Sequence, residues 1–297
     1  MCQGRGVCVR DREVSERSRN AARRRTKTGR TEGMTTINPN EAQASIDHAS
    51  RNNATELSST QSATTASSRP AKTAFITGAT RGLGRAIAEE LSKDHHIIVG
   101  GSSETAVEVA KELPSAEPFV ADLTDLKKIQ QEVARVGVES LDVIVHGAGV
   151  VAHKATTETS APEWQKAFDV NFFAVAELTR LLLPALQKTG GTLVAINSGA
   201  GNHSGVGYGP YACTKHALRA YTDALREEQR GKIRVTSIHP GKADSDMQRQ
   251  IQAARGNEYD PSQFIKPESI AQAVRLAVDL GDDSVIEELV IRPANGK

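Results

Sequence analysis

This chain of 297 residues has few cysteines and no long apolar segment. These two absences argue against a disulfide-stabilised protein and against a membrane-spanning one. Its three cysteines show no paired spacing, so the sequence predicts neither a disulfide framework nor a bound metal. Cys213 is interpreted as a packing residue rather than a nucleophile, because no histidine and carboxylate accompany it. No run of about 18 apolar residues is present, so no membrane span is expected.

The chain also lacks the strong positive charge of a nucleic-acid-binding domain. Residues 1–70 hold twelve Lys and Arg against seven Asp and Glu, whereas the remainder holds 25 basic and 29 acidic residues. The basic run at 5–30 could bind polyanions, but we interpret it as a solvated tail. Because no strongly basic folded domain remains, nucleic acid is not expected as a partner. The acidic residues of the basic run do not fit a transit peptide, and no apolar signal segment is present, so we expect a cytoplasmic protein.

Composition divides the chain near residue 70. The stretch 52–68 consists mostly of Ser, Thr, Ala, Gln and Asn, with little to bury, so residues 1–70 are predicted to be a disordered extension. From residue 71 onward, short apolar runs alternate with helical periodicity. The sequence therefore predicts one folded domain over 71–297.

The alternation predicts seven strands with intervening helices. Several strands are almost continuously apolar, as expected where helices cover both faces of a parallel sheet. The predicted strands are 73–77, 97–101, 118–121, 141–146, 192–197, 234–239 and 288–291. The predicted helices are 83–92, 105–112, 125–136, 162–188 (with an interruption), 211–229 and 267–280. The expected fold class is α/β, a doubly wound, Rossmann-type parallel sheet of seven strands.

Ser198, Tyr211 and Lys215 have the chemistry and spacing to act on a carbonyl group. Ser198 follows the apolar run 192–197, and Tyr211 and Lys215 lie one turn apart on a predicted helix. A phenol, with a pKa of about 10, is too weak an acid for proton transfer at neutral pH, so the Lys215 cation is expected to lower this pKa. Ser198 can donate a hydrogen bond to an oxygen that gains charge. Such a set requires a hydride carrier.

A glycine-rich turn after the first predicted strand supplies a site for that carrier. The segment 77–84 reads Thr-Gly-Ala-Thr-Arg-Gly-Leu-Gly and runs directly into a predicted helix. Gly78, Gly82 and Gly84 permit a tight turn and a close backbone approach to phosphates, while the helix N-terminus adds N–H donors. This strand–turn–helix context favours dinucleotide binding over a simple chain reversal.

These motifs resemble those of the short-chain dehydrogenase/reductase superfamily, in its compact single-domain form typical of small bacterial members. The resemblance covers about 72–295 and rests on Thr-Gly-x-x-x-Gly-x-Gly followed by Tyr-x-x-x-Lys with an upstream Ser. It implies a catalytic set of Asn171, Ser198, Tyr211 and Lys215, with Asn171 in a kinked helix that holds a water of a proton relay. It implies interconversion of a carbonyl and an alcohol with NADP(H) or NAD(H).

The resemblance also implies which residues contact the dinucleotide. Asp122 would hydrogen-bond the adenine, with capping of the next helix as its other role. His146 stands where the family has Asn and is expected to be structural. Ser245 would bond the nicotinamide carboxamide or cap a helix. The full set of expected cofactor contacts is Gly78, Thr80, Arg81, Gly82, Leu83, Gly84, Ser102, Asp122, Leu123, Gly147, Ala148, Gly149, Asn171, Tyr211, Lys215, Pro240 and Gly241.

The sequence after the second strand favours NADP(H). Sites that prefer NAD place an acid there to hold the ribose 2′-hydroxyl. The segment 99–103 reads Val-Gly-Gly-Ser-Ser and contains no carboxylate to repel a 2′-phosphate. Arg81 matches a family position at which a basic residue meets that phosphate, and Ser102 can add a hydrogen bond. We therefore expect NADP(H), with NAD(H) as the second choice.

Two other functions stay open. A catalytically silent NADP(H)-binding regulator of the same fold would keep the glycine turn but would often lose Tyr211 or Lys215. A sugar epimerase or dehydratase of the extended branch would need more chain after Pro240.

The substrate is a small carbonyl or alcohol compound that the sequence does not identify. Its contacts are expected from Val151, His153, the loop 203–208 and a mobile lid at 247–265. By analogy with the family, the helices that contain Asn171 and Tyr211 would form a homodimer or homotetramer.

Overall fold

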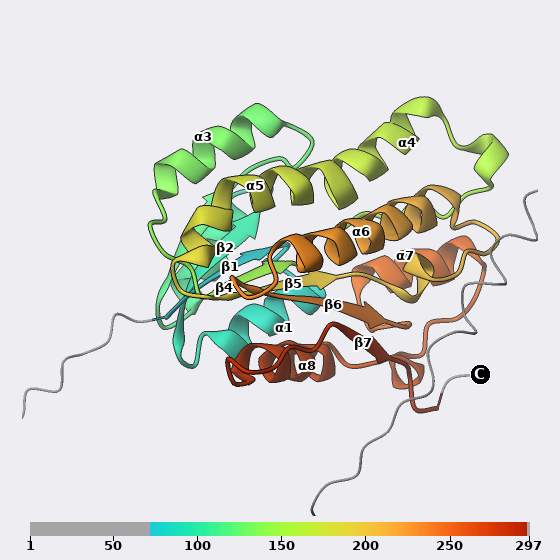
Figure 1. The fold of residues 1–297 in the computed structure, drawn as a ribbon. Helices are drawn as coiled ribbons and strands as arrows, with labels where there is room; N and C mark the ends of the chain where they lie inside the picture. Colours follow the sequence, from blue (N-terminus) through green and yellow to red (C-terminus); the bar gives the residue numbers. More distant parts are fainter. Residues whose placement is uncertain (1–71, 296–297) are drawn as a thin grey trace, which may run out of the picture. The chain divides into compact units, whose positions relative to one another are not determined.

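The computed structural model describes residues 72–295, which form a seven-stranded parallel sheet with helices on both faces (Figure 1). The strand order is β3-β2-β1-β4-β5-β6-β7, so β4 returns beside β1 and the sheet is doubly wound. The strands are β1 Lys72–Thr77, β2 His95–Gly101, β3 Ala116–Val120, β4 Val143–His146, β5 Thr192–Ile196, β6 Arg234–Pro240 and β7 Glu288–Ile291. The predicted fold class is confirmed, whereas the disorder predicted for residues 1–70 lies outside the described residues.

Alternate side chains of the central strands enter two apolar cores. The helices are α1 Gly82–Leu91, α2 Thr105–Glu112, α3 Leu126–Val136, α4 Ala161–Phe168, α5 Ala174–Gln187, α6 Gly209–Glu228, α7 Asp246–Ala254 and α8 Pro267–Asp279. Helices α1 and α8 lie below the sheet in Figure 1, and α3, α5 and α6 lie above it. In β1, Ile76 packs in the core with α1 and α8, whereas Phe75 packs in the core with α3, α5 and α6. Both cores are continuous across the sheet, which explains why β4 is apolar at every position from Val143 to Val145.

The structure confirms one feature of the predicted helices and adds one helix that was not predicted. The expected interruption of the helix over 162–188 is confirmed as a π-helical turn at Asp169–Phe173 between α4 and α5. Helix α7 was not predicted, because Gln248 and Gln252 take buried positions that are usually apolar and so weaken its periodicity. Ser245 caps α7, since its Oγ accepts the N–H of Gln248 at 3.3 Å.

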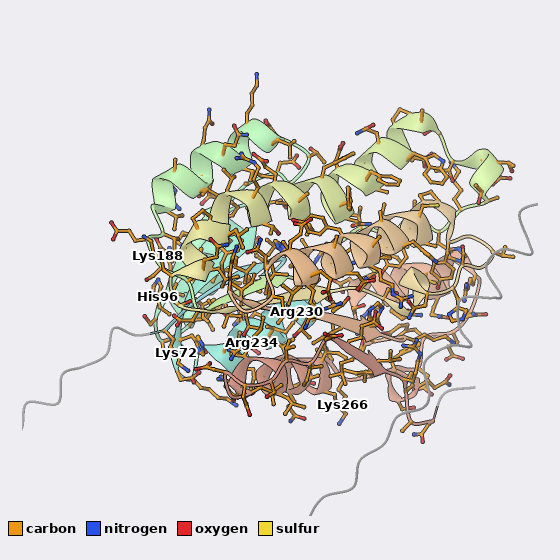
Figure 2. The ribbon with its side chains drawn as sticks, viewed as in Figure 1. Lys72, His96, Lys188, Arg230, Arg234 and Lys266 are labelled. Atoms are coloured by element: carbon orange, nitrogen blue, oxygen red, sulfur yellow. The ribbon has the colours of Figure 1, made fainter. Side chains whose placement is uncertain are left out.

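The amino and carboxyl ends of the strands carry different residues. Figure 2 shows Lys72, His96 and Lys188 at the side where β1 and β2 begin. The glycine-rich loops follow the carboxyl ends of the strands, and open α/β sheets bind their ligands at these ends. Within residues 72–295, no helix is long and apolar enough to cross a membrane.

Candidate active site

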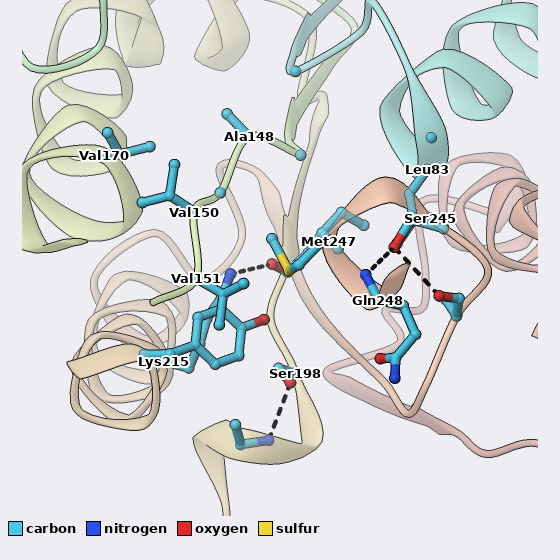
Figure 3. Close-up of a pocket in the computed structure, with 18 of the residues that line it drawn as sticks. Leu83, Ala148, Val150, Val151, Val170, Ser198, Lys215, Ser245, Met247 and Gln248 are labelled. Atoms are coloured by element: carbon cyan, nitrogen blue, oxygen red, sulfur yellow. Dashed lines mark hydrogen bonds between the residues drawn. The ribbon is translucent and has the colours of Figure 1, made fainter. Parts of the chain in front are cut away.

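One cleft of about 2100 Å³ lies at the carboxyl ends of β1, β4, β5 and β6. Figure 3 shows Leu83, Ala148, Ser198 and Lys215, from four different segments, around this cleft. Asn171 is the one predicted site residue that does not line it. The predicted residues that do are Gly78, Thr80, Arg81, Gly82, Leu83, Gly84, Ser102, Asp122, Leu123, Gly147, Ala148, Gly149, Ser198, Tyr211, Lys215, Pro240 and Gly241.

The turn between β1 and α1 requires glycine for two separate reasons. Gly78 adopts a φ of +69°, and a Cβ at this position would lie 2.8 Å from the Cα of Ala148. A Cβ on Gly84 would overlap the carbonyl oxygen of Gly78. The turn is therefore packed against both α1 and the loop after β4, and its backbone lines the cleft with no side chain in between.

The start of α1 fits a phosphate group. Arg81 is the N-cap residue, but its side chain makes no capping hydrogen bond, and no acidic residue occupies the first turn. The first N–H groups of α1 therefore lack a side-chain acceptor, which is the arrangement that binds anions at helix N-termini. The Arg81 side chain is 76% exposed, and its contact with Asp246 is long, at 3.6 Å. Arg81 thus adds a second, largely free positive charge beside the turn.

Thr77 couples the glycine turn to the loop after β4. Its Oγ1 accepts the N–H of Gly147 at 3.1 Å and the N–H of Ala148 at 3.2 Å. A Cβ on Gly147 would lie 2.8 Å from the carbonyl oxygen of Thr77, so the two segments touch through their backbones. The two loops predicted to border the cofactor are thereby fixed to one another.

Asp122 lies at the adenine end of the expected site. Its Oδ1 accepts both the N–H and the hydroxyl of Thr124 at 2.9 Å, and these hydrogen bonds lower the pKa of its carboxyl. The alternative capping role considered for Asp122 is wrong, because Asp125 caps α3 by accepting the N–H groups of Lys127 and Lys128. Asp122 therefore stays ionised and lines the cleft.

His146 is structural, as expected for a buried residue at the end of β4. Its Nε2 pairs with Thr179 Oγ1 at 2.9 Å. Burial, with a smaller contribution from the charge of Lys215, lowers the pKa of His146 to about 3. A histidine that stays neutral and lies outside the cleft lining has no acid–base role here.

Asn171 shapes the cleft from behind its wall. It lies in the π-helical turn, is fully buried, and its Oδ1 accepts the N–H of Val150 at 2.8 Å. Its Nδ2 donates to the carbonyl of Val150 at 2.9 Å and to Thr214 Oγ1 at 3.0 Å. The amide holds the loop that carries Val150, and the contact of Asn171 with the cofactor stays a prediction.

Ser198 is fixed on three sides at the end of β5. Its N–H donates to Asn197 Oδ1 at 2.9 Å, and its carbonyl accepts from Nδ1 of the buried His239 at 3.1 Å. Its Oγ accepts the N–H of Ala200 at 3.1 Å, as Figure 3 shows, which leaves the hydroxyl proton available for the cleft. The serine is held in place before any substrate arrives.

Tyr211 and Lys215 lie one turn apart on α6, and both are buried in the lining of the cleft. Burial raises the pKa of Tyr211, and a hydrogen bond with the Ser198 side chain acts in the opposite direction. Burial also lowers the pKa of Lys215 to about 8.

The expectation that Lys215 lowers the pKa of Tyr211 is therefore wrong for this structure. The Lys215 Nζ lies 5.8 Å from the centroid of the Tyr211 ring and donates to the carbonyl of Ile196 at 2.8 Å. Because the ammonium is itself desolvated and turned to a backbone oxygen, it does not offset the burial of the phenol.

Helix α7 lines the cleft, and a backbone bridge closes the base of the segment that carries it. A bridge between Ala243 and Ile265 joins the two ends of the segment that contains the expected lid, 247–265, and the N–H of Asp244 donates to the carbonyl of Ile265 at 2.8 Å. At its far end, Arg255 Nε donates to His153 Nε2 at 3.0 Å and lies 5.2 Å from the Tyr208 ring centroid. The predicted substrate loops thus meet at this end of α7.

Sequence reasoning missed three residues that shape the site. Thr77 and His239 lie inside motifs that were singled out, directly before Gly78 and Pro240, so the signal was present. Arg292 follows β7, lines the cleft, and lies in no motif. Only the register of β7 beside β6 reveals its position.

Known proteins share this sequence pattern and fold. The family model for short chain dehydrogenases matches residues 72–256. The chain is 30% identical over 236 residues to the glycine betaine reductase of Emericella nidulans, covering 75% of this chain and 19% of that longer protein. It is also 30% identical over 234 residues to the serine 3-dehydrogenase of Agrobacterium fabrum, covering 75% of this chain and 94% of the relative.

A solved structure of an oxidoreductase has a similar fold. The alcohol dehydrogenase of the archaeon Thermococcus sibiricus, complexed with 5-hydroxy-NADP, superposes with a TM-score of 0.69 at 27% identity and covers 76% of this chain and 98% of its own. Because the family model spans most of the sheet and the cleft described above, the chain belongs to the short-chain dehydrogenase/reductase family of oxidoreductases.

Proposed function

We propose that this chain is an NADP(H)-dependent oxidoreductase that interconverts a carbonyl and an alcohol by hydride transfer. The observation that carries the proposal is that Ser198, Tyr211 and Lys215 line the same cleft as the glycine turn, with Lys215 one turn beyond Tyr211 on α6. A hydroxyl and a phenol in the lining of one cleft can hold a carbonyl oxygen and supply the proton of the product alcohol.

The bound dinucleotide would supply the hydride. The glycine turn of 78–84 and the start of α1 would hold its pyrophosphate, and Asp122 its adenine. The segments 147–149 and 240–241 would border its nicotinamide half, and Lys215 would hold the ribose hydroxyls next to the nicotinamide.

The choice of NADP(H) over NAD(H) rests on the charges near the end of β2. Arg81 is exposed beside the turn, Ser102 is exposed after β2, and the segment 100–103 carries no carboxylate. The NADP derivative in the Thermococcus sibiricus structure is consistent with this choice.

In the reductive direction, each residue has a separate task. Ser198 holds the carbonyl oxygen through its hydroxyl proton. Tyr211 donates a proton to the same oxygen as negative charge develops on it. Lys215, with its pKa near 8, exchanges protons close to neutral pH and can return one to Tyr211. Asn171 keeps the loop at Val150 in place, and its π-helical turn would hold the water that links Lys215 to solvent.

The names of the relatives do not agree on a substrate. Serine and glycine betaine carry a carboxylate, whereas an alcohol dehydrogenase is named for the hydroxyl group alone. The names of the relatives therefore identify no class of substrate for this chain.

Self-association through α4–α5 and α6 is part of the proposal. An exposed hollow is lined by aromatic side chains that include Trp164, Phe168 and Phe173, and Phe173 is 44% exposed. Burying these rings against a second copy would remove apolar surface from water. Light scattering should show a dimer or tetramer, and Phe173→Asp should shift it toward monomer; a monomeric wild type would contradict this part.

The test of the proposed reaction is an NADPH-oxidation screen over aldehydes, ketones and 3-oxoacyl thioesters, with NADPH binding measured on the same protein. Turnover of at least one compound with NADPH, at higher efficiency than with NADH, is the expected result. Tight NADPH binding with no turnover across the panel would contradict it and favour the silent regulator.

A further inference from the structure

Arg292 lies beside the reacting end of the cleft. It follows Ile291, which pairs with Pro240 across the β6–β7 register. A Cβ on Gly199 would lie 3.0 Å from Arg292 Nη2, and a Cβ on Gly241 would lie 3.2 Å from Arg292 Cδ. The side chain therefore crosses from β7 over β6 to the residue that follows Ser198.

The guanidinium is anchored along one side only. Its Nη1 donates to the carbonyl of His239 at 2.8 Å and to that of Ile291 at 3.2 Å. Within residues 72–295, no hydrogen-bond acceptor meets its Nε or Nη2, and no carboxylate forms an ion pair with Arg292. Nε and Nη2 form the edge of a guanidinium that binds a carboxylate with two parallel hydrogen bonds.

The charge of Arg292 has no neighbour of opposite sign in this part of the lining. The stretches 196–200, 203–205, 240–243 and 292–295 contribute no Asp or Glu to the cleft. Of the acidic groups elsewhere in the cleft, Glu163 pairs with Lys154 at 3.3 Å and Asp246 lies 3.6 Å from Arg81.

The cofactor does not account for this cation. The glycine turn that fits the pyrophosphate follows β1, whereas Arg292 follows β7, and β4, β5 and β6 lie between them in the sheet. The phosphate-binding charges, Arg81 and the start of α1, are on the far side of Ser198.

We propose that Arg292 binds the carboxylate of the substrate, so that the preferred substrates are oxo acids and the corresponding hydroxy acids. This inference rests on the proposed function. The free edge of Arg292 would hold the carboxylate while Ser198 and Tyr211 hold the carbonyl oxygen, which fixes the substrate at two points.

The test compares oxo acids of increasing length with their methyl esters, namely 3-oxobutanoate, 4-oxopentanoate and 5-oxohexanoate, as substrates with NADPH. The wild type should reduce at least one acid with a higher kcat/KM than its ester. Arg292→Gln should lower kcat/KM for that acid about tenfold to a hundredfold and leave the ester within about twofold. Arg292→Lys should give an intermediate loss, because it keeps the charge but not the paired donors.

Two variants separate this role from a general effect of charge. Arg219→Gln removes an arginine that pairs with Glu288 on β7 and does not line the cleft, so it should not change the preference for acids. Lys242→Gln removes another positive charge from the same lining and should have a smaller effect than Arg292→Gln. Equal losses for acid and ester in Arg292→Gln, or a larger loss in Lys242→Gln, would overturn the assignment.

Binding distinguishes failure of this inference from failure of the proposed reaction. Calorimetric titration of the same acids and esters into protein saturated with NADP⁺ needs no turnover. If no compound is reduced but the acids still bind more tightly than the esters, and only while Arg292 is present, the assignment of Arg292 stands and the proposed reaction fails. If acids and esters bind equally, the assignment is overturned.

Discussion

The side-chain amide of Asn171 holds both backbone groups of Val150, accepting its N–H at 2.8 Å and donating to its carbonyl at 2.9 Å. Val150 lines the cleft directly after the 147–149 segment. An asparagine inside a π-helical turn therefore sets the position of a loop that comes from a different strand.

Replacing Asn171 by Ala should lower the free energy of unfolding by about 1–3 kcal/mol, because the partly buried N–H and carbonyl of Val150 and the buried Oγ1 of Thr214 would each lose a partner. Urea denaturation measures this change. Asn257→Ala is the control, since Asn257 is exposed and bonds only Gln252, and it should shift stability by less than about 0.5 kcal/mol. Equal stability of Asn171→Ala and the wild type would contradict the positioning role.

The contact between His239 and Ser198 leads to a prediction about turnover. Because a carbonyl only accepts, Nδ1 of His239 must carry the proton, and Nε2 then accepts from Ser237 Oγ at 3.0 Å. His239→Leu removes the donor that fixes Ser198 and should lower kcat about tenfold to a hundredfold with unchanged NADPH affinity. His239→Asn offers an amide donor in place of Nδ1 and should retain most of the activity; equal losses in both variants would argue against this contact.

Lys215 should make stability depend on pH in a defined window. Its pKa is about 8 in the folded protein and 10.5 as the reference value, so between these pH values the unfolded chain binds a proton that the folded chain does not. The free energy of unfolding of the wild type should therefore rise with pH across this window, relative to Lys215→Met, by up to about 3 kcal/mol. Parallel curves for the two proteins, measured by urea denaturation from pH 7 to 11, would contradict the lowered pKa.

The element order, the glycine turn and the position of Ser198 followed from the sequence, because each depends on a local pattern. Because residues such as Phe75 and Ile76 are buried on opposite faces of the sheet, the strand is recognisable in the sequence as a continuous apolar run. The glycine turn is recognisable by the spacing of its glycines. Helix α7 was missed since its buried face includes Gln248 and Gln252, whose burial depends on tertiary contacts.

The electrostatics of the site were not predictable in the same way. The spacing of Tyr211 and Lys215 is local, but the pKa of each depends on burial by segments distant in sequence. The position of Arg292 likewise depends on the pairing of β7 with β6, which no sequence motif records.

Removal of the Arg81 side chain should weaken the binding of NADPH but not that of NADH. Arg81→Ala should weaken NADPH binding about tenfold to a hundredfold and leave NADH binding within about twofold, because only NADPH carries a 2′-phosphate to pair with. Fluorescence titration measures both affinities. Arg85→Ala is the matched control, since Arg85 is already paired with Glu89 at 2.6 Å and Glu112 at 2.7 Å. Equal weakening of NADPH and NADH binding in Arg81→Ala would contradict the proposed NADP(H) preference.

Tyr211→Phe tests most directly whether Tyr211 transfers the proton in carbonyl reduction. This variant keeps the ring and loses only the hydroxyl, so kcat for the best substrate should fall by about 100-fold or more while the affinity for NADPH stays within about twofold of the wild type. Turnover by Tyr211→Phe at the wild-type rate would contradict the account.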